Sequence, residues 1–169
     1  MNNNINYMKC SITSLLLFLL LLFNACERKK QELVFFPFSF QNETEQYMQK
    51  HEYIVVVYID SSGCSPCLFN NLKMWKYFEN NLENNNTGVL FIIRSSDEQS
   101  VINALKSNKL TFPFIFDKEG IFKARNNEAF NITKDSVFVI DRNQIIIMSE
   151  SPIASEKQWN AFLKTIAKN

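Results

Sequence analysis

Apolar residues follow two patterns along the chain, continuous blocks and helical spacing. Continuous blocks rich in β-branched and aromatic residues indicate strands that are covered on both faces. Apolar positions three and four residues apart indicate one buried face of a helix. The blocks predict strands over 52–60, 87–94, 111–117, 136–141 and 144–148. The spacing predicts helices over 64–84, 96–105 and 155–166, a short helix is expected over 42–51, and the polar stretch 121–134 carries neither pattern.

Local signals set the ends of several elements. Ser96 with Gln99, and Ser155 with Gln158, match the capping box that opens a helix. The last two strands form a hairpin around residues 142–143. Because strands alternate with helices before this closing hairpin and helix, the order predicts an α/β fold with a mixed central β-sheet and helices on both faces.

The first 25 residues predict the signal peptide of a lipoprotein. Their apolar run, residues 11–23, is shorter than the ~20 residues that cross a bilayer and has the length of a signal-peptide core. The stretch "LFNAC" resembles the lipobox of bacterial lipoproteins, in which cleavage leaves Cys26 lipid-modified at the new N-terminus. An uncleaved anchor is the alternative. Both predict an exported domain tethered to a membrane in the cell envelope, and the lipobox predicts one that faces the periplasm.

The remaining chain divides into a tether and one domain. Residues 26–41 form the tether and lead-in, in which Pro37 limits "ELVFFPFSF" to an edge strand or an extended segment. Residues 42–169 form the folded domain, which is long enough for a core of its own.

Composition excludes several functional classes. The chain has only three glycines and no GxGxxG or GxxxxGK[ST], which argues against a glycine-rich phosphate site. The net charge is +1 without a basic stripe, so no nucleic-acid partner is predicted. The single histidine, His51, is expected at the surface and argues against histidine-based catalysis or a histidine-rich metal site.

Two cysteines remain in the predicted domain, Cys64 and Cys67, and they form a CxxC. If the first strand ends near Asp60 and the helix begins near Cys64, the first sulfur lies at a helix N-terminus, where backbone N–H groups and the helix dipole favour the thiolate. Cys67 follows one turn later, close enough to bond to Cys64. Pro66 suits the first turn, where a missing N–H costs nothing. This geometry predicts an exposed nucleophile at Cys64 and a resolving thiol at Cys67.

Two other uses of the cysteine pair are less favoured. A structural disulfide would close so small a loop that it would stabilise the fold little. A zinc site needs about four ligands, and no second CxxC or CxxH is present. The residues therefore favour a redox pair without a metal or cofactor, while an inert pair and a metal-binding pair stay open.

The sequence "VVVYIDSSGCSPC", followed by an amphipathic helix, resembles the strand–CxxC–helix unit of the thioredoxin superfamily. "FPFIFDKEG" and "VFVIDRNQIII" resemble segments of its TlpA-like, membrane-anchored branch, and the resemblance covers roughly residues 45–168. It implies a thioredoxin fold, thiol–disulfide exchange, and cysteine-containing partner proteins outside the cytoplasm. Carried over by position, Cys64 is the nucleophile and Cys67 the resolving cysteine.

Three positions depart from the family pattern. Gly63 replaces the usual tryptophan before the first cysteine, and Tyr58 stands where thioredoxin has a buried acid. Asp135 stands where the family keeps a cis-proline that faces the CxxC, although a register shift would put Lys134 or Ser136 there. Since a non-proline cis bond costs ~3 kcal/mol, a trans peptide is expected. Pro66, Asp135 and Ser136 are the predicted substrate-facing residues.

The leading hypothesis is a lipid-anchored thiol–disulfide oxidoreductase that exchanges disulfides with extracytoplasmic proteins. A reducing direction is predicted because Ser-Pro between the cysteines lacks the histidine that marks strong oxidants of this superfamily, and a membrane or periplasmic thiol would supply the electrons. The alternative is a redox-weak module that binds a client or metal through the two cysteines and Asp135. A peroxidase is disfavoured because Ser61 fits the peroxiredoxin motif but Val57 stands in place of its proline.

Overall fold

The computed structural model describes residues 31–34, 42–60, 65–132 and 136–168, with the backbone alone at 42, 65–71, 73 and 132. All of these lie in one folded unit, Gln31–Asn169. The elements in chain order are α2 (Asn42–Lys50), β1 (Tyr53–Asp60), α3 (Ser65–Glu83), β2 (Thr87–Arg94), α4 (Glu98–Ser107), β3 (Phe114–Phe116), α5 (Ile121–Arg125), α6 (Asn127–Ile132), β4 (Val137–Asp141), β5 (Ile146–Met148) and α7 (Glu156–Ile166).

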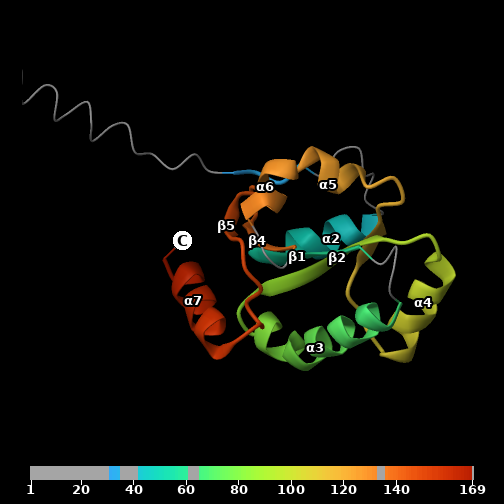
Figure 1. Cartoon of the computed structure of the whole chain (residues 1–169). Coiled ribbons are helices and arrows are strands. Elements are labelled where there is room, and N and C mark those ends of the chain that lie inside the picture. Colours follow the sequence, from blue (N-terminus) through green and yellow to red (C-terminus); the bar gives the residue numbers. More distant parts are fainter. Residues whose placement is uncertain (1–30, 35–41, 61–64, 133–135, 169) are drawn as a thin grey trace, which may run out of the picture. The chain divides into compact units, whose positions relative to one another are not determined.

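The five described strands form one mixed sheet in the order β3-β2-β1-β4-β5 (Figure 1). The central strand, β1, is parallel to β2 and antiparallel to β4. The edge strands continue this scheme, because β3 is parallel to β2 and β5 is antiparallel to β4. The predicted mixed sheet is confirmed. Its parallel half places the carboxyl ends of β1, β2 and β3 along a single edge.

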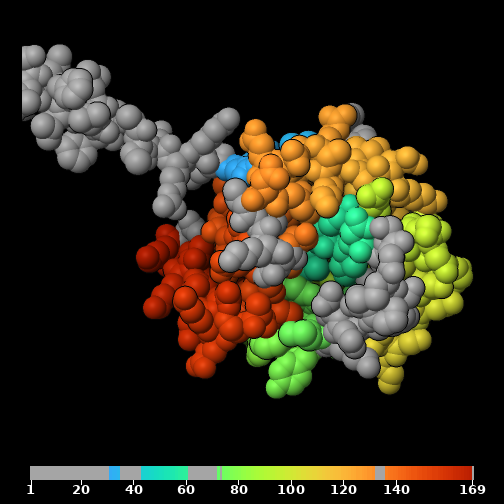
Figure 2. All heavy atoms as spheres, viewed as in Figure 1, coloured from blue at the N-terminus to red at the C-terminus, as the bar shows by residue number. Residues whose placement is uncertain are grey.

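Each face of the sheet carries its own apolar core. On one face, β1 and β2 pack against buried residues of α3, α4 and α7, and an edge-to-face contact of Trp75 with Phe91 lies within this core. On the other face the same strands pack against Phe122 of α5 and Ala129 of α6, with partly buried residues of α2 at the margin. Helices therefore cover both faces, as predicted, and α4, α5, α6 and α7 also contribute to the molecular surface in Figure 2.

The lead-in segment protects the β5 edge of the sheet. The Leu33 N–H donates to the Gln144 carbonyl at 3.0 Å, and the Ile146 N–H donates to the Gln31 carbonyl at 2.8 Å. The Leu33 side chain is fully buried. Part of the predicted lead-in is thus bound to the sheet edge, while residues 35–41 lie outside the described residues.

One of the two predicted capping boxes is correct. Ser155 is the N-cap of α7, and its hydroxyl oxygen accepts the Gln158 N–H, as predicted. The box at Ser96 and Gln99 is wrong by one residue, because Asp97 caps α4 and accepts the Ser100 N–H at 3.0 Å. The Asp97 carboxylate also lies at the partial positive charge of the helix N-terminus, where an anion is favourable.

The stretch 121–134, which carries no clear pattern in the sequence, contains two short helices, α5 and α6. Gly120 precedes α5 with a left-handed φ of 68°. Between the helices, Asn126 holds the lead-in: its side-chain oxygen accepts the Val34 N–H and its amide donates to the Val34 carbonyl. These helices are held by long-range contacts rather than by a periodic apolar face.

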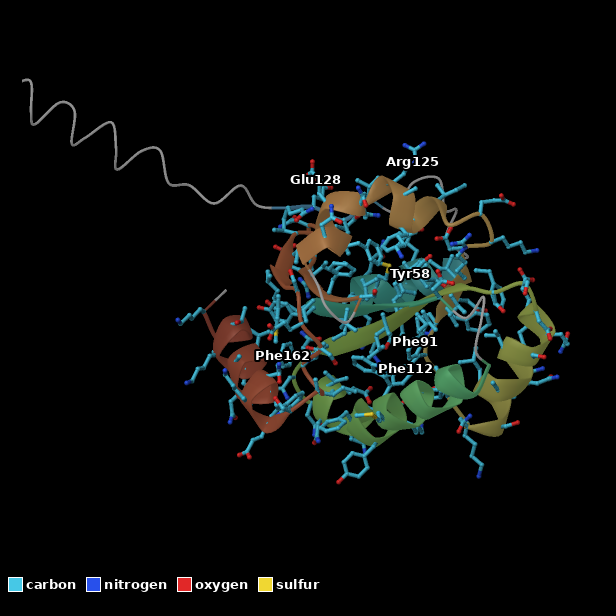
Figure 3. The ribbon with its side chains drawn as sticks, in the orientation of Figure 1. Tyr58, Phe91, Phe112, Arg125, Glu128 and Phe162 are labelled. Carbon is cyan, nitrogen blue, oxygen red and sulfur yellow. The ribbon has the colours of Figure 1, made fainter. Side chains whose placement is uncertain are left out.

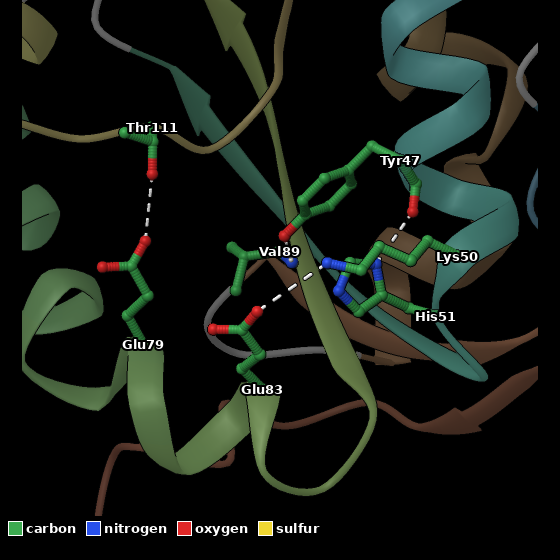
Figure 4. Close-up of polar contacts among 7 residues, drawn as sticks. All are labelled: Tyr47, Lys50, His51, Glu79, Glu83, Val89 and Thr111. Carbon is green, nitrogen blue, oxygen red and sulfur yellow. Dashed lines mark hydrogen bonds and ion pairs between the residues drawn. The ribbon is translucent and has the colours of Figure 1, made fainter.

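His51 is buried, with only 5% of its surface exposed, so the expectation that it lies at the surface is wrong. Its Nδ1 lies 2.8 Å from the Tyr47 carbonyl, which can only accept, so Nδ1 carries the proton. The Tyr47 hydroxyl accepts the Val89 N–H at 3.0 Å (Figure 4). Together these two side chains anchor α2 to the start of β2. This start lies at the amino ends of the parallel strands, opposite to the carboxyl end of β1.

Candidate functional site

The predicted strand-to-helix junction is present at the CxxC. β1 ends at Asp60 and α3 begins at Ser65. Pro66 and Cys67 occupy the second and third positions of α3, so their backbones lie in its first turn. Proline fits there because the first N–H groups of a helix have no intrahelical acceptor. Cys64 and the Cys67 side chain lie outside the described residues, so the positions of the two sulfur atoms remain predictions.

The segment before β4 approaches the same end of β1. β4 is antiparallel to β1, with Val137 opposite Val57. Ser136 directly precedes β4, and its carbonyl accepts the Tyr58 N–H at 2.9 Å. Ser136 has a φ of 51°, a left-handed conformation that is uncommon for a residue other than glycine. Asp135 and Lys134 lie outside the described residues, and their position beside the cysteines remains a prediction.

Tyr58 stands at the position of the family's buried acid. It is a neutral group on the face of the sheet opposite to the face that α3 covers. It is 4% exposed and packs against Phe122 and Phe130, whereas α3 packs against the opposite face (Figure 3). Its hydroxyl has no hydrogen-bond partner among the described residues. Burial, followed by the charge of Asp117, raises the pKa of Tyr58 to about 12. The phenol therefore keeps its proton at neutral pH and cannot act there as an anionic base.

Asp117 supplies a buried carboxylate that the sequence analysis did not single out. It is 1% exposed and follows β3. One carboxylate oxygen accepts the Ile121 N–H at 2.7 Å and the other accepts the Phe122 N–H at 3.2 Å. These bonds satisfy two free donors at the start of α5. The signal in the sequence is an aspartate placed just before the turn "KEG" and the apolar pair that follows it.

An ion pair joins the carboxyl ends of β1 and β2. Asp60 and Arg94 are register partners, and Arg94 Nη1 lies 3.5 Å from Asp60 Oδ2. Arg94 also lines a surface hollow of about 410 Å³, together with a second ion pair, Lys118 with Glu98 at 2.9 Å. Arg94 cannot be recognised as a site residue from the sequence, because only the strand register places it opposite Asp60.

Among the described residues, no group of three or more histidine, cysteine or acidic side chains could hold a metal ion. The described helices are also too short or too polar to cross a membrane.

The Redoxin family matches residues 41–162 of the sequence. The chain belongs to the Redoxin family. The matched segment runs from the residue before α2 into α7 and includes both cysteines of the CxxC. Among curated proteins, none matches this Redoxin-family chain significantly.

Solved structures similar to this Redoxin-family chain share its fold. A putative thiol-disulfide oxidoreductase from Bacteroides vulgatus has a TM-score of 0.54 and 16% identity, covering 75% of this chain and 80% of the other. The thioredoxin domain of another thiol-disulfide oxidoreductase from Bacteroides vulgatus has a TM-score of 0.50 and 17% identity, covering 69% and 81%. Peroxidoxin BcpB from Mycobacterium tuberculosis has a TM-score of 0.52 and 11% identity, covering 72% and 82%.

The predicted thioredoxin fold is confirmed by these neighbours. The family match and the fold also confirm the predicted class, a thioredoxin-like oxidoreductase of the thioredoxin superfamily.

Proposed function

We propose that this protein is a lipid-anchored, extracytoplasmic thiol–disulfide oxidoreductase whose Cys64–Cys67 pair exchanges disulfides with protein substrates. One observation carries the proposal: a CxxC spans the strand-to-helix junction between Asp60 and α3 in a Redoxin-family chain. The backbone N–H groups of the first turn of α3 favour a thiolate at that position. No metal or organic cofactor is required for the exchange.

The exchange proceeds in two balanced steps. The Cys64 thiolate attacks one sulfur of a client disulfide, which breaks the client S–S bond, forms a mixed disulfide and releases one client thiolate that takes a proton. The Cys67 thiolate then attacks the Cys64 sulfur and releases the second client thiol. Two electrons pass to the client, and the protein is left with a Cys64–Cys67 disulfide. A membrane or periplasmic dithiol returns it to the reduced form and is itself oxidised.

The reducing direction rests on the residues between the cysteines. Ser65 and Pro66 add no positive charge that would stabilise the Cys64 thiolate beyond the helix N-terminus. Stronger stabilisation of the thiolate makes a pair more oxidising. The substrate backbone would dock along Pro66, Asp135 and Ser136, and the left-handed Ser136 fixes the direction in which the chain enters β4.

The location of the protein rests on its N-terminus. Residues 1–25 would direct export, and Cys26 would carry the lipid that anchors the domain to a membrane facing the periplasm. Residues 26–30 leave a short charged tether before Gln31, the first described residue. Partners are accordingly cysteine-containing proteins of the same compartment, where disulfides persist.

Peroxidase chemistry is disfavoured, although one structural neighbour is a peroxidoxin. The peroxiredoxin motif needs a proline at position 57, where this chain has valine. Val57 lies within β1, between Phe91 of β2 and Val137 of β4, and is 4% exposed. A proline there would remove a backbone donor from a central strand. The local fold therefore suits valine.

An insulin-reduction assay with dithiothreitol tests the proposal. The full chain is expected to accelerate the precipitation of reduced insulin chains, and Cys64→Ala is expected to lose all acceleration. Cys67→Ala should also lose turnover, because its mixed disulfide is not resolved. Equal rates for the wild type and Cys64→Ala would reject the exchange activity in favour of the redox-weak binding module.

A further inference from the structure

The β3 strand leaves one edge of the sheet open. It is the last strand in the sheet order, and β2 is its only partner among the described strands. The Pro113 carbonyl accepts the Phe91 N–H of β2 at 3.1 Å. Backbone groups of successive residues in a strand point to opposite sides, so those of Phe114 and Phe116 point away from β2. No described residue forms a hydrogen bond with these outward groups.

The opposite edge of the sheet is closed by the chain itself. There the lead-in pairs with β5, because the Ile146 N–H donates to the Gln31 carbonyl and an isolated bridge joins Glu32 to Ile145. Open edges are templates for pairing with another chain, and proteins blunt them with charges or with a covering segment. β3 carries no charged residue, and Phe114 at its start is 36% exposed. Such an edge is suited to receive another strand.

The segment that leads into β3 is already fixed in place. The Thr111 hydroxyl donates to the Glu79 carboxylate of α3 at 3.1 Å (Figure 4), and the Pro113 carbonyl is bonded to β2. The rings of Phe114 and Phe116 contact each other edge to face, with their centroids 5.5 Å apart. A backbone that is already extended loses less conformational entropy on pairing than a flexible one does. The edge is therefore preorganised for a partner strand.

A hollow of about 710 Å³ lies beside this edge. Its described lining combines residues 111–116 with Ile102 of α4, and with Tyr47 and the first turn of α2. Most of these side chains are apolar, and the volume falls within the ~300–1,000 Å³ that is usual for sites that bury a ligand. The hollow can therefore receive side chains of a strand that pairs with β3.

The charge of the hollow indicates the chemistry of the partner. Glu43 is the only charged residue in its described lining, and the Glu43 side chain is exposed. A second copy of the chain that paired through its own β3 would bring residues 111–116, which include no lysine or arginine. That strand would therefore bring no opposite charge to Glu43. An extended segment with apolar side chains and a lysine or arginine complements the hollow better.

We propose that the open edge of β3 docks an extended segment of a partner protein, with a basic side chain beside Glu43 and apolar side chains in the hollow. The segment pairs with the outward backbone groups of Phe114 and Phe116 and continues the sheet as an added strand. The backbone bonds supply affinity, and the hollow selects the side chains. The inference goes beyond the proposed function, because it involves neither Cys64 nor Cys67.

Binding of the fluorescein-labelled peptide KVTVTVK to the full chain tests the inference. Fluorescence anisotropy should show saturable binding with a Kd below about 1 mM. Phe114→Lys should weaken this binding about tenfold or more, because it removes an apolar contact and places a charge on the edge. Tyr77→Lys is the matched control, because Tyr77 is an aromatic residue of α3 that is 80% exposed, and its replacement should leave the affinity unchanged.

Glu43→Gln is a second variant, at an exposed position that leaves the core intact. It should weaken binding of KVTVTVK about threefold and leave binding of the neutral peptide QVTVTVQ unchanged. Glu45→Gln removes the same charge from the same helix, outside the described lining of this hollow, and should change neither affinity.

Three results would overturn the inference. The first is the absence of saturable binding to the wild type, and the second is an equal loss of affinity in Phe114→Lys and Tyr77→Lys. The third is an equal effect of Glu43→Gln and Glu45→Gln on the binding of KVTVTVK. If the chain binds no peptide but forms a dimer in analytical ultracentrifugation that Phe114→Lys abolishes, the edge belongs to a second copy and the proposed partner is wrong.

Discussion

The Ser136 carbonyl accepts the Tyr58 N–H at 2.9 Å, which joins the start of β4 to β1 two residues before β1 ends. β1 leads into the CxxC, and Ser136 follows directly on Asp135. Two segments separated by about 70 residues in the sequence are therefore bound to the same end of one strand. This bond is the structural basis for expecting Asp135 near the cysteines.

Asp135→Asn should lower the Cys64 pKa. If the carboxylate lies beside the sulfurs, its charge disfavours the thiolate, and the neutral amide removes that effect. The shift is expected to be roughly half a pKa unit if the interaction is as weak as that between charges near a protein surface, and thiol titration of the reduced protein measures it. Asp135→Pro should lower the pKa as well and also raise insulin reduction, provided that the backbone accepts the cis form. An identical Cys64 pKa in wild type and Asp135→Asn would contradict the proximity of Asp135.

The central strands could be predicted from the sequence because their signal is local. β1 and β2 are continuous apolar runs, and all their residues except the last are buried. The predicted ranges of the shorter strands are too long, since Phe112 is buried outside β3 and Ile145 forms only an isolated bridge. An apolar run marks burial, whereas a strand boundary depends on which neighbouring backbone is in register.

Tyr58→Phe should not destabilise the fold at neutral pH. The hydroxyl is buried without a partner among the described residues, so its removal should leave the free energy of unfolding unchanged or raise it by up to about 1 kcal/mol. Urea unfolding at pH 7 measures this. Tyr53→Phe is the matched control, because the Tyr53 hydroxyl donates to the Ile166 carbonyl at 3.2 Å and its loss should cost about 1 kcal/mol.

Tyr58→Phe should also remove part of the loss of stability at alkaline pH. Folding raises the pKa of Tyr58 from 10.0 to about 12, so the unfolded chain loses this proton first. The stability due to the neutral phenol is complete below pH 10 and is lost as the pH rises to about 12, a change on the order of 2 kcal/mol. The unfolding free energy of the variant should therefore fall less steeply between pH 10 and 12. Parallel pH profiles for wild type and variant would show that the phenol does not titrate in this way.

Gly88→Ala should loosen the attachment of α2. A Cβ atom at Gly88 would lie 2.8 Å from Cε1 of Tyr47 and 2.9 Å from Nδ1 of His51, closer than real contacts allow. One of these rings has to move, at a cost of about 1–3 kcal/mol in unfolding free energy. Combining the change with His51→Ala should cost less than the sum of the two single variants, because the ring is no longer there. Full additivity would contradict this packing.

The burial of His51 illustrates why long-range features escaped prediction. Histidine is intermediate between the buried and the exposed residue types, so a lone histidine before a strand gives no local signal of burial. Here Gly88 opens the space that its ring fills, and Tyr47 supplies the acceptor. Likewise Asp60 and Arg94 are 34 positions apart, and only the parallel register of β1 and β2 makes them neighbours. Spacing within one segment carries no information about such pairs.

Cys26→Ser should abolish the lipid anchor. If Cys26 is acylated after signal cleavage, the serine variant should accumulate as unprocessed precursor or appear as soluble protein. Membrane fractionation with a mass measurement of the intact chain distinguishes these forms. A variant that stays in the membrane at the precursor length of the wild type would instead mean that the apolar run is a retained anchor.

The most direct measurement of the proposed activity is the capture of a mixed disulfide by the Cys67→Ala protein. Removing Cys67 leaves Cys64 to attack a client disulfide but takes away the thiol that would release it. Non-reducing separation followed by mass spectrometry should find client proteins joined to the peptide that contains Cys64, and the Cys64→Ala, Cys67→Ala double variant should capture none. Equal capture by the two variants, or a linkage that maps to Cys10 or Cys26, would contradict the assignment of Cys64 as the nucleophile of disulfide exchange.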